Sequence, residues 1–312
     1  MKLLIITKER KMTDFAFSSY NYGAIDVGSN AIRLLIASVK VYGDNDPVFK
    51  KISLIRVPIR LGEDVFLKGA ISQENVARLK DTMQSYDLLM KTHKVRSYKA
   101  YATSAMREAT NGKEVRDIIA AQTGVNIEII NGSDEAAIIA ATDLKNIVDT
   151  NKVYLYVDVG GGSTEFTLFA DGKEIASESF KIGTVRLLHN LVDAAAWDDV
   201  EKWIKEKTAG YAMVDLIGSG GNINNIFKSS GKHITKPLTY FYLSRYYKTL
   251  QSYSYEERMY YLNLNQDRAD VIIPASLIYL NAMKWSKANH IYVPKIGLTD
   301  GIIKSIFNAD NR

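Results

Sequence analysis

The sequence predicts an α/β protein built from two related halves that face each other. Residues 23–38 (GAIDVGSNAIRLLIAS) are similar to residues 156–171 (YVDVGGGSTEFTLFAD). In both segments a β-branched run enters a loop of small residues directly after an Asp, and an apolar run leaves it, which indicates strand, turn and strand. Helical and extended patterns alternate between the two segments, as is typical of α/β domains. Two equivalent loops in one chain indicate an internal duplication.

Periodicity predicts the remaining elements. Apolar residues at helical spacing place a helix over residues 72–92, with Ser72 as its N-cap. Ser133 is expected to cap another helix, which carries acidic residues in its first turn. A long amphipathic helix with an irregularity at Pro274 is expected over residues 268–287. The other expected segments are strands at residues 97–103, 125–130 and 211–217, helices at residues 112–122, 184–190 and 194–208, and a helix that starts at Asn222.

Length and charge set broad limits on the protein. A chain of 312 residues with 46% hydrophobic residues is long enough for two domains with buried cores. We expect residues 1–20 to form a flexible N-terminal extension, residues 21–138 an N-terminal domain and residues 139–312 a C-terminal domain. Residues 1–120 carry 20 Lys and Arg against 13 Asp and Glu, which leaves 20 against 22 for the rest. Such a basic half would attract a polyanion, although an ordinary solvated basic surface is the alternative.

Several classes of protein are excluded or disfavoured. The chain contains no cysteine, which excludes disulfides, thiolate catalysis and cysteine zinc sites. No apolar run approaches the ~20 residues of a membrane span, and the run at residues 3–6 is too short for a signal peptide. We therefore expect a cytoplasmic protein. Eight tyrosines at residues 240–261 lie among few basic residues, so we expect them to pack helices together and not to bind nucleic acid.

Two glycine-rich loops have the composition of phosphate-binding sites. We call residues 26–30 (DVGSN) the first glycine loop and residues 158–165 (DVGGGSTE) the second glycine loop. Backbone N–H groups in such a loop can converge on one point, and the missing side chains let a phosphate approach them. Each loop taken alone could equally be an ordinary hairpin turn. The candidate phosphate-binding residues are Gly28, Ser29 and Asn30, then Gly160, Gly161, Gly162, Ser163 and Thr164, and, at a third small-residue turn, Gly220, Gly221 and Asn222.

Carboxylates accompany both loops. Asp26 and Asp158 lie where a strand enters each loop, a position suited to holding Mg²⁺ or Mn²⁺ beside phosphates. If the second glycine loop folds back as a hairpin, Glu165 returns to the same place, where it could share the metal or orient water; a solvent-facing strand residue is the alternative. Arg107 suits a phosphate fork, with a solvated surface Arg as the competing interpretation. Glu135 could deprotonate water, although acidic residues in a first helical turn commonly only complement the helix dipole.

These segments give the chain a family resemblance. It resembles the Ppx/GppA phosphatases, which are exopolyphosphatases and guanosine pentaphosphate phosphohydrolases of the actin-like ATPase superfamily. The resemblance implies two ribonuclease-H-like domains with the active cleft between them, Glu135 as general base, Glu165 as a second catalytic carboxylate, and Arg107 at the phosphates. The segments that carry it are AIDVGSNAIRLLI, YATSAMREATN, IINGSDEA, VDVGGGSTEF, KIGTVRL, IGSGGNINNI and DRADVIIPA, in this order.

The chain also departs from the family pattern. Asp134 replaces the first Glu of the family's paired glutamates, Asn222 replaces a Thr, and Thr299 stands where the family's LREG segment has Arg. The chain ends before the C-terminal HD-like domain of longer members would begin. We expect an exopolyphosphatase that releases orthophosphate; pppGpp 5′-phosphohydrolase, actin-like kinase and non-catalytic polyphosphate or alarmone sensor are the alternatives. We expect polyphosphate or pppGpp as the binding partner and expect neither nucleic acid nor a membrane. A homodimer is the expected assembly.

Overall fold

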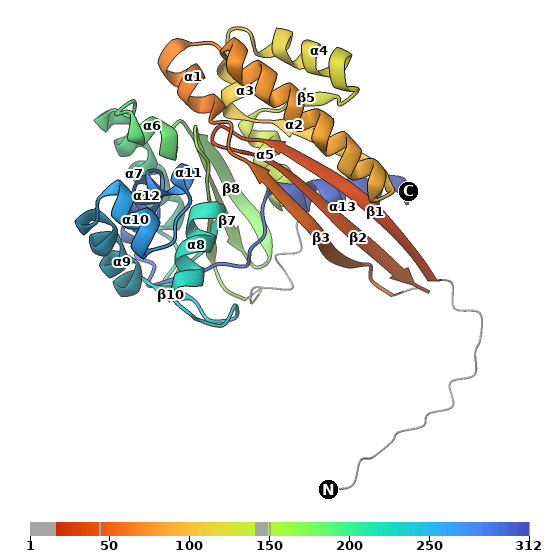
Figure 1. The fold of residues 1–312 in the computed structure, drawn as a ribbon. Coiled ribbons are helices and arrows are strands. Elements are labelled where there is room, and N and C mark those ends of the chain that lie inside the picture. Colours follow the sequence, from red (N-terminus) through yellow and green to blue (C-terminus); the bar gives the residue numbers. More distant parts are fainter. Residues whose placement is uncertain (1–16, 44, 141–148, 150, 312) are drawn as a thin grey trace, which may run out of the picture.

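Two β-sheets organise the chain (Figure 1). The computed structural model describes residues 17–43, 45–140, 149 and 151–311. The first sheet has the strand order β3-β2-β1-β4-β5 and the second has the order β10-β11-β9-β6-β7-β8. The first sheet contains β1 (Phe17–Val27), β2 (Ile32–Tyr42), β3 (Val48–Val57), β4 (Val95–Ala102) and β5 (Ile127–Ile129). The second contains β6 (Tyr154–Val159), β7 (Thr164–Ala170), β8 (Lys173–Phe180), β9 (Asp215–Ser219), β10 (Leu238–Thr239) and β11 (His290–Tyr292).

The two sheets share one topology. In the first, β1, β2 and β3 form an antiparallel meander, and β4 and β5 then add in parallel beside β1. In the second, β6, β7 and β8 form the same meander, and β9 and β11 add in parallel beside β6. The short strand β10 extends the second sheet beyond this pattern. The two related halves that the sequence predicts are therefore confirmed, down to the hairpin in each loop segment.

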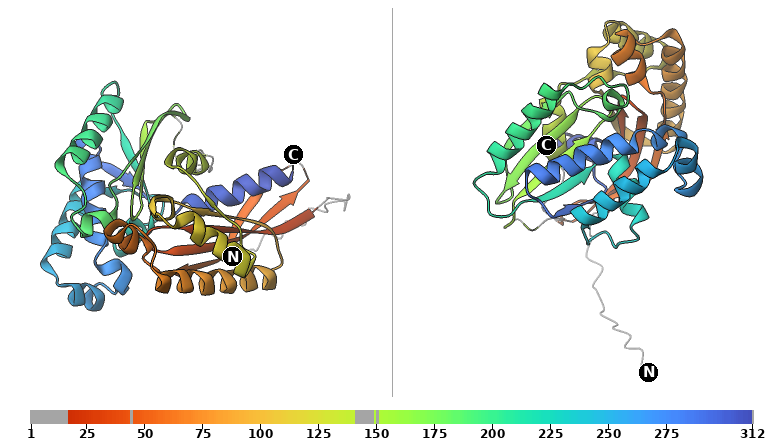
Figure 2. Two further views of the ribbon diagram at one scale, coloured as in Figure 1. Left: turned by 90° about the horizontal axis from the view of Figure 1, so that it is seen from above. Right: turned by 90° about the vertical axis from the view of Figure 1, so that its left-hand side faces the viewer.

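Helices cover both sheets. The first half contains α1 (Leu61–Lys68), α2 (Gln73–Thr92), α3 (Ser104–Glu108), α4 (Gly112–Thr123) and α5 (Gly132–Ala140). The second half contains α6 (Thr184–Leu188), α7 (Ala194–Thr208), α8 (Gly221–Ser229), α9 (Tyr240–Ser252), α10 (Tyr255–Tyr261), α11 (Gln266–Ala269) and α12 (Ile272–Trp285). Helix α13 (Leu298–Asp310) follows β11 and returns to the first sheet. Figure 2 shows α2 and α13 on opposite faces of that sheet.

The buried residues form three hydrophobic cores, and successive residues of one strand point to opposite faces of the sheet and so enter different cores. Ile25 and Leu34 face α2, whereas Ala24 and Leu35 face α13. The core on the α13 side also contains Tyr156 of the second sheet, so it joins the two halves. The predicted domain boundary between residues 138 and 139 lies inside α5. Helix α13, which belongs to the predicted C-terminal domain, packs against β1, β2 and β4 of the first sheet.

Other sequence predictions differ from the structure in detail. The extension predicted at residues 1–20 overlaps β1, because Phe17 already pairs with Tyr42 across the hairpin; residues 1–16 lie outside the described part. The predicted cap Ser133 is replaced by Asn131, whose Oδ1 accepts a hydrogen bond from the Asp134 N–H at 2.8 Å. The strand expected at residues 211–217 is β9, which starts and ends later, at Asp215 and Ser219. The helices at residues 72–92, 112–122 and 194–208 are confirmed.

The long helix predicted at residues 268–287 is two helices. Helix α11 ends at Ala269 and α12 begins at Ile272, with the Asp270 side chain accepting a hydrogen bond from the next backbone N–H. Pro274 lies in the first turn of α12, where a missing N–H leaves no helical hydrogen bond unmade. The interruption lies at Asp270, whose carbonyl would clash with the Pro274 ring in a continuous helix, so the irregularity predicted at this proline is present.

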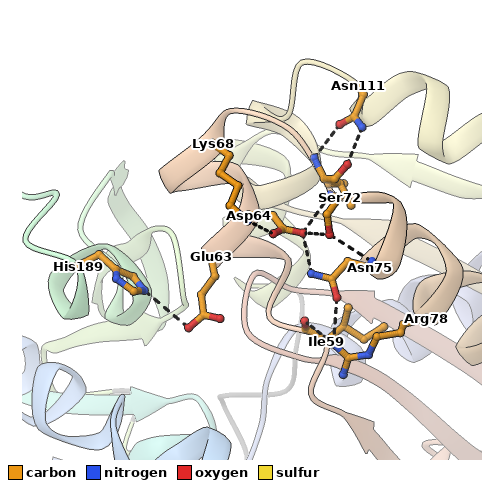
Figure 3. Close-up of polar contacts among 10 residues, drawn as sticks. Ile59, Glu63, Asp64, Lys68, Ser72, Asn75, Arg78, Asn111 and His189 are labelled. Atoms are coloured by element: carbon orange, nitrogen blue, oxygen red, sulfur yellow. Dashed lines mark hydrogen bonds and ion pairs between the residues drawn. The ribbon is translucent and has the colours of Figure 1, made fainter.

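Helix α1 is fastened to the start of α2 by one carboxylate (Figure 3). Oδ2 of Asp64 accepts hydrogen bonds from the Ser72 N–H, the Ser72 hydroxyl and the Asn75 amide, at 3.0, 2.5 and 2.7 Å. Although burial opposes ionisation, these hydrogen bonds hold the Asp64 pKa below its usual range. On its other side α1 presents Glu63 to His189 of α6, as the same view shows. Helix α1 thus holds a fixed place between the two halves.

We predict that Asp64→Ala lowers the free energy of unfolding by about 1–3 kcal/mol at pH 7, because three donors lose their acceptor. The contribution should be lost as pH falls below ~4 through the lowered pKa of Asp64. Asp87→Ala is the matched control: Asp87 also pairs with a lysine four residues later but is a surface ion pair, which typically contributes under ~0.5 kcal/mol. Urea unfolding at pH 7 compares the two; equal losses would contradict the assigned role of Asp64.

Candidate active site

A cleft of about 320 Å³ lies where the two halves meet. The first glycine loop enters it from β1 and the second from β6, and the third small-residue turn borders it at the start of α8. The predicted residues that line it are Asp26, Gly28, Ser29, Asn30, Glu135, Asp158, Gly160, Gly161, Ser163, Glu165, Gly220, Gly221 and Asn222. Segments far apart in sequence therefore converge as expected.

The first glycine loop is held by its neighbours on both sides. The Gly28 N–H donates to Ala31 O, which closes the turn. The Ser29 hydroxyl lies 2.9 Å from that of Ser104, and Ser29 O accepts from the Gly62 N–H of α1 at 2.7 Å. The Asn30 amide reaches across the cleft to donate to the backbone oxygen of Asp267. The loop is thus fixed by contacts to both halves of the protein.

The second glycine loop touches the first. A Cβ on Gly161 would lie 2.9 Å from Ser29 Cβ and 3.2 Å from Asn30 N, so only glycine permits this approach. The other side of the loop is held by α6, whose first N–H groups donate to Gly160 O and Gly161 O. The mutual contact explains why the glycines are needed even before any ligand binds.

Two predicted phosphate residues point away from the cleft. A Cβ on Gly162 would collide with the Phe66 ring and Ser104, so this glycine serves packing between the halves. The buried Thr164 hydroxyl donates to Ile182 O. Their conformations stabilise the loop, and neither lines the cavity.

Four carboxylates converge at the base of the cleft. Asp158 and Glu165 are direct partners in the β6–β7 hairpin, as the predicted fold-back requires. Glu165 is only 2% exposed, and its Oε1 accepts hydrogen bonds from the hydroxyls of Ser163 and Ser179 at 2.6 and 2.9 Å. Asp26 comes from β1 and Glu135 from the first turn of α5. The Glu135 Oε2 atom is buried and has no hydrogen-bond partner among the described residues.

Burial and nearby negative charges raise the pKa values of Glu135, Asp158 and Glu165. Burial raises the pKa of Glu165 to about 7, with the Asp158 charge adding to it against the hydrogen bond from Ser163. Burial, with the Asp26 charge, raises the pKa of Asp158 to about 6 although Arg33 opposes this. The pKa of Glu135 lies well above its usual range, first through burial and then through Glu165, Asp26 and Asp158. A site of this kind favours a proton or a cation.

The acids suit a hard divalent cation. No group of three His, Cys, Asp or Glu side chains in the described residues is close enough to hold a metal by itself. Mg²⁺, however, is commonly bound by one or two carboxylates with water and substrate phosphates completing its shell. Glu135 Oε2 has no hydrogen-bond partner among the described residues, and the raised pKa values of Glu135 and Asp158 reflect burial and repulsion from neighbouring acids. A bound cation would offset this repulsion. Asp26, Asp158 and Glu165 are thus not arranged to hold a metal as a group of three, whereas one or two of them suit an Mg²⁺ ion that water and phosphate oxygens also bind.

Beside the acids lies a group of arginines that sequence reasoning missed. Arg33 donates to Asp26 Oδ2 at 2.6 Å, Arg56 forms an ion pair with Asp267, and Arg268 donates to the Asn222 side chain. Burial and the nearby Arg56 and Arg33 lower the pKa of Arg268 to about 10. Lys51 and Lys295 line the cleft farther on. The signal was the strand register, since Arg33 lies opposite both Asp26 and Arg56.

The structure places Arg107 behind the acids and not in the cleft lining. Its Nη1 donates to Ile130 O at 2.8 Å, directly before α5. Its side chain lines a separate groove between α4 and β5. From there its charge opposes the rise in the pKa of Glu135 and Glu165. In this structure Arg107 therefore supports the helix that carries Glu135.

We predict that Glu165→Gln stabilises the protein above pH 7 in buffer without divalent cations. The folded-state pKa of about 7 exceeds the usual Glu value of 4.5, so the folded state binds more protons and stability falls as pH rises between these values. The variant should gain on the order of 2 kcal/mol at pH 8 and little near pH 4.5. Thermal unfolding against pH measures this, with the exposed Glu178→Gln as control. A variant that melts below the wild type at pH 8 would refute the assignment.

Comparison with known proteins agrees with this geometry. The model of the Ppx/GppA phosphatase family matches residues 38–309. The exopolyphosphatase 2 of Mycobacterium tuberculosis is 33% identical over 176 residues, which is 53% of this chain and 52% of that protein. The guanosine-5′-triphosphate,3′-diphosphate pyrophosphatase of Vibrio parahaemolyticus is 28% identical over 178 residues, 56% of this chain and 34% of that protein. The chain spans about half the length of the first of these relatives and less of the second.

A solved structure covers nearly the whole fold. An exopolyphosphatase from Cytophaga hutchinsonii superposes with a TM-score of 0.79 at 22% identity, covering 93% of this chain and 98% of that one. The likeness confirms the predicted fold class, an α/β protein of two ribonuclease-H-like halves. With the family model matching most of its length, the chain belongs to the Ppx/GppA phosphatase family.

Proposed function

We propose that the protein is an exopolyphosphatase that releases orthophosphate from the end of a polyphosphate chain. The observation that carries this proposal is the layout of the cleft, with four carboxylates at its base and three arginines directly beside them. Acids that can activate water, placed next to arginines that can bind phosphates, suit a substrate made of successive phosphates. The names of the relatives from M. tuberculosis and C. hutchinsonii support it.

In the proposed reaction, Glu135 accepts a proton from the attacking water at its unpartnered Oε2. Its pKa is raised above that of an ordinary Glu, which is the direction in which a catalytic carboxylate is tuned for general-base work. The water oxygen bonds to the terminal phosphorus while the bond to the bridging oxygen breaks, and the shortened chain leaves with that oxygen. Backbone N–H groups of the two glycine loops, with Arg33 nearby, stabilise the developing charge.

Other chain residues orient these groups. Ser163 and Ser179 fix the carboxylate of Glu165, and Arg107 holds the backbone before α5 that presents Glu135. Mg²⁺ or Mn²⁺, bound by one or two of Asp26, Asp158 and Glu165 together with water, would neutralise phosphate charge. A cytoplasmic location, a homodimeric assembly and the absence of nucleic-acid and membrane partners stay predictions; no helix in the described part of the chain is long and apolar enough to cross a bilayer.

A second candidate is the hydrolysis of pppGpp to ppGpp. An apolar pocket of about 150 Å³ adjoins the cleft and shares Lys51 and Asp300 with it. Its walls include Leu35, Phe49 and Ile303, side chains that suit a nucleobase. The name of the relative from V. parahaemolyticus favours this alternative.

We predict that Glu135→Gln reduces phosphate release from polyphosphate with Mg²⁺ by at least about 100-fold, because the general base is lost. The substrate KM should change little. Asp134→Asn is the matched control, since Asp134 is an exposed acid in the same helical turn and does not line the cleft. Stopped assays for orthophosphate give both values. Full activity of Glu135→Gln would remove Glu135 from its role, and no release by the wild type would favour a sensor.

We predict that Lys295→Met raises the KM for long polyphosphate by about threefold, the effect of one partly screened charge. The same change should affect pppGpp less, because a shorter anion reaches fewer cations. Lys91→Met, on the surface of α2, is the control. Parallel assays with short polyphosphate, long polyphosphate, pppGpp and ATP also rank the substrates. A higher kcat/KM for pppGpp than for any polyphosphate would transfer the proposal to the second candidate.

A further inference from the structure

We propose that Arg186 is a positioning residue that sets the second glycine loop against the helix supporting the general base. The residue belongs to the KIGTVRL segment, to which the site described above gives no chemical role. The inference rests on the proposed function, since it concerns how that catalytic site is held together.

Arg186 contacts three elements with one side chain. From α6, its Nε donates to Gly162 O in the second glycine loop at 2.7 Å. Its Nη2 donates to Glu108 Oε2 at the end of α3, at 2.6 Å. Its guanidinium lies over the ring of Phe66 in α1, 3.9 Å from the centroid. Two of these three partners, Glu108 and Phe66, belong to the first half of the protein.

Through Glu108, Arg186 is connected to the helix that carries the proposed general base, Glu135. Glu108 directly follows Arg107 in α3, and Arg107 donates to the backbone before α5, the helix of Glu135. Through Gly162, Arg186 is connected to the other carboxylate, because Gly162 precedes Ser163, whose hydroxyl donates to Glu165. Arg186 therefore links the loop that carries Glu165 to the helix that supports Glu135. It spans the boundary that separates these two acids.

The chemistry of the contacts requires arginine. The guanidinium offers two separate donors in one rigid plane, and its face can stack on an aromatic ring. Lysine has a single nitrogen and cannot span Gly162 O and Glu108 in the same way. The side chain is only 11% exposed and is not among the residues that line the cleft. Its role is therefore to hold the loop, and the phosphates are left to Arg33, Arg56 and Arg268.

The test compares Arg186→Lys, Arg186→Met and Glu108→Gln with Lys181→Met. Lys181 is a matched control because it also lies near Glu108, at 3.5 Å, but is 76% exposed and has no bond to the loop. In steady-state assays with polyphosphate, both Arg186 variants should lose about tenfold or more in kcat, as displaced catalytic groups do. Their KM should stay within about threefold, because the arginines of the cleft are untouched. Arg186→Met combined with Glu108→Gln should be no worse than Arg186→Met alone.

Amide hydrogen exchange supplies a readout independent of turnover. Residues 158–165 should exchange faster in the Arg186 variants and unchanged in Lys181→Met, because only the former lose a bond to the loop. If the wild type hydrolyses no phosphate substrate, the proposed function fails while the exchange measurement still decides the positioning role. Unchanged kcat and unchanged exchange in Arg186→Lys would overturn the inference. A similar loss of kcat in Lys181→Met would mean that only the charge near Glu108 matters, and it would also overturn the positioning role of Arg186.

Discussion

The close approach of the two glycine loops is the constraint on which the rest of the site depends. Gly161 leaves no room for a side chain beside Ser29, so the loops of two separate sheets meet backbone to backbone. Each loop follows a strand that delivers an aspartate, and the contact therefore brings Asp26 and Asp158 into one cleft. Helices α1 and α6 hold the loops from outside through Gly62 and Val185. The duplicated topology becomes a single site only because this contact is possible.

That convergence concentrates negative charge, and the surroundings compensate for it unevenly. Arg33 pairs with Asp26, whereas Glu165 receives only hydroxyl hydrogen bonds and Glu135 Oε2 receives none from the described residues. The raised pKa values of Glu135, Asp158 and Glu165 are the result. Such a site is costly in the free protein, and the cation and phosphates of the proposed reaction would offset that cost. Strongly perturbed acids of this kind are common at catalytic sites.

The sequence predicted the local features of the fold better than the long-range ones. Both hairpins, the convergence of the loops and the helix after Ser72 follow from short patterns of residues, and all are present. Arg33 and Arg56 were missed because their position beside the acids depends on strand register, and Arg268 was missed because α11 reaches the cleft only through the tertiary fold. Arg107 was predicted to lie at the phosphates, whereas its side chain contacts Ile130 O. The direction of a side chain cannot be read from a motif. The return of α13 to the first sheet depends on tertiary packing, which no local pattern encodes.

The return of α13 has a consequence for biosynthesis. One face of the first sheet, including Tyr22, Leu35 and Val39, is buried largely by α13 residues such as Ile302 and Phe307. The ribosome makes that sheet long before α13, so the sheet's second face remains without this cover until α13 has left the exit tunnel. Exposed apolar surface of this kind promotes aggregation. Completion of the first half must therefore wait for a helix that begins at Leu298, more than 200 residues after β2 ends at Tyr42.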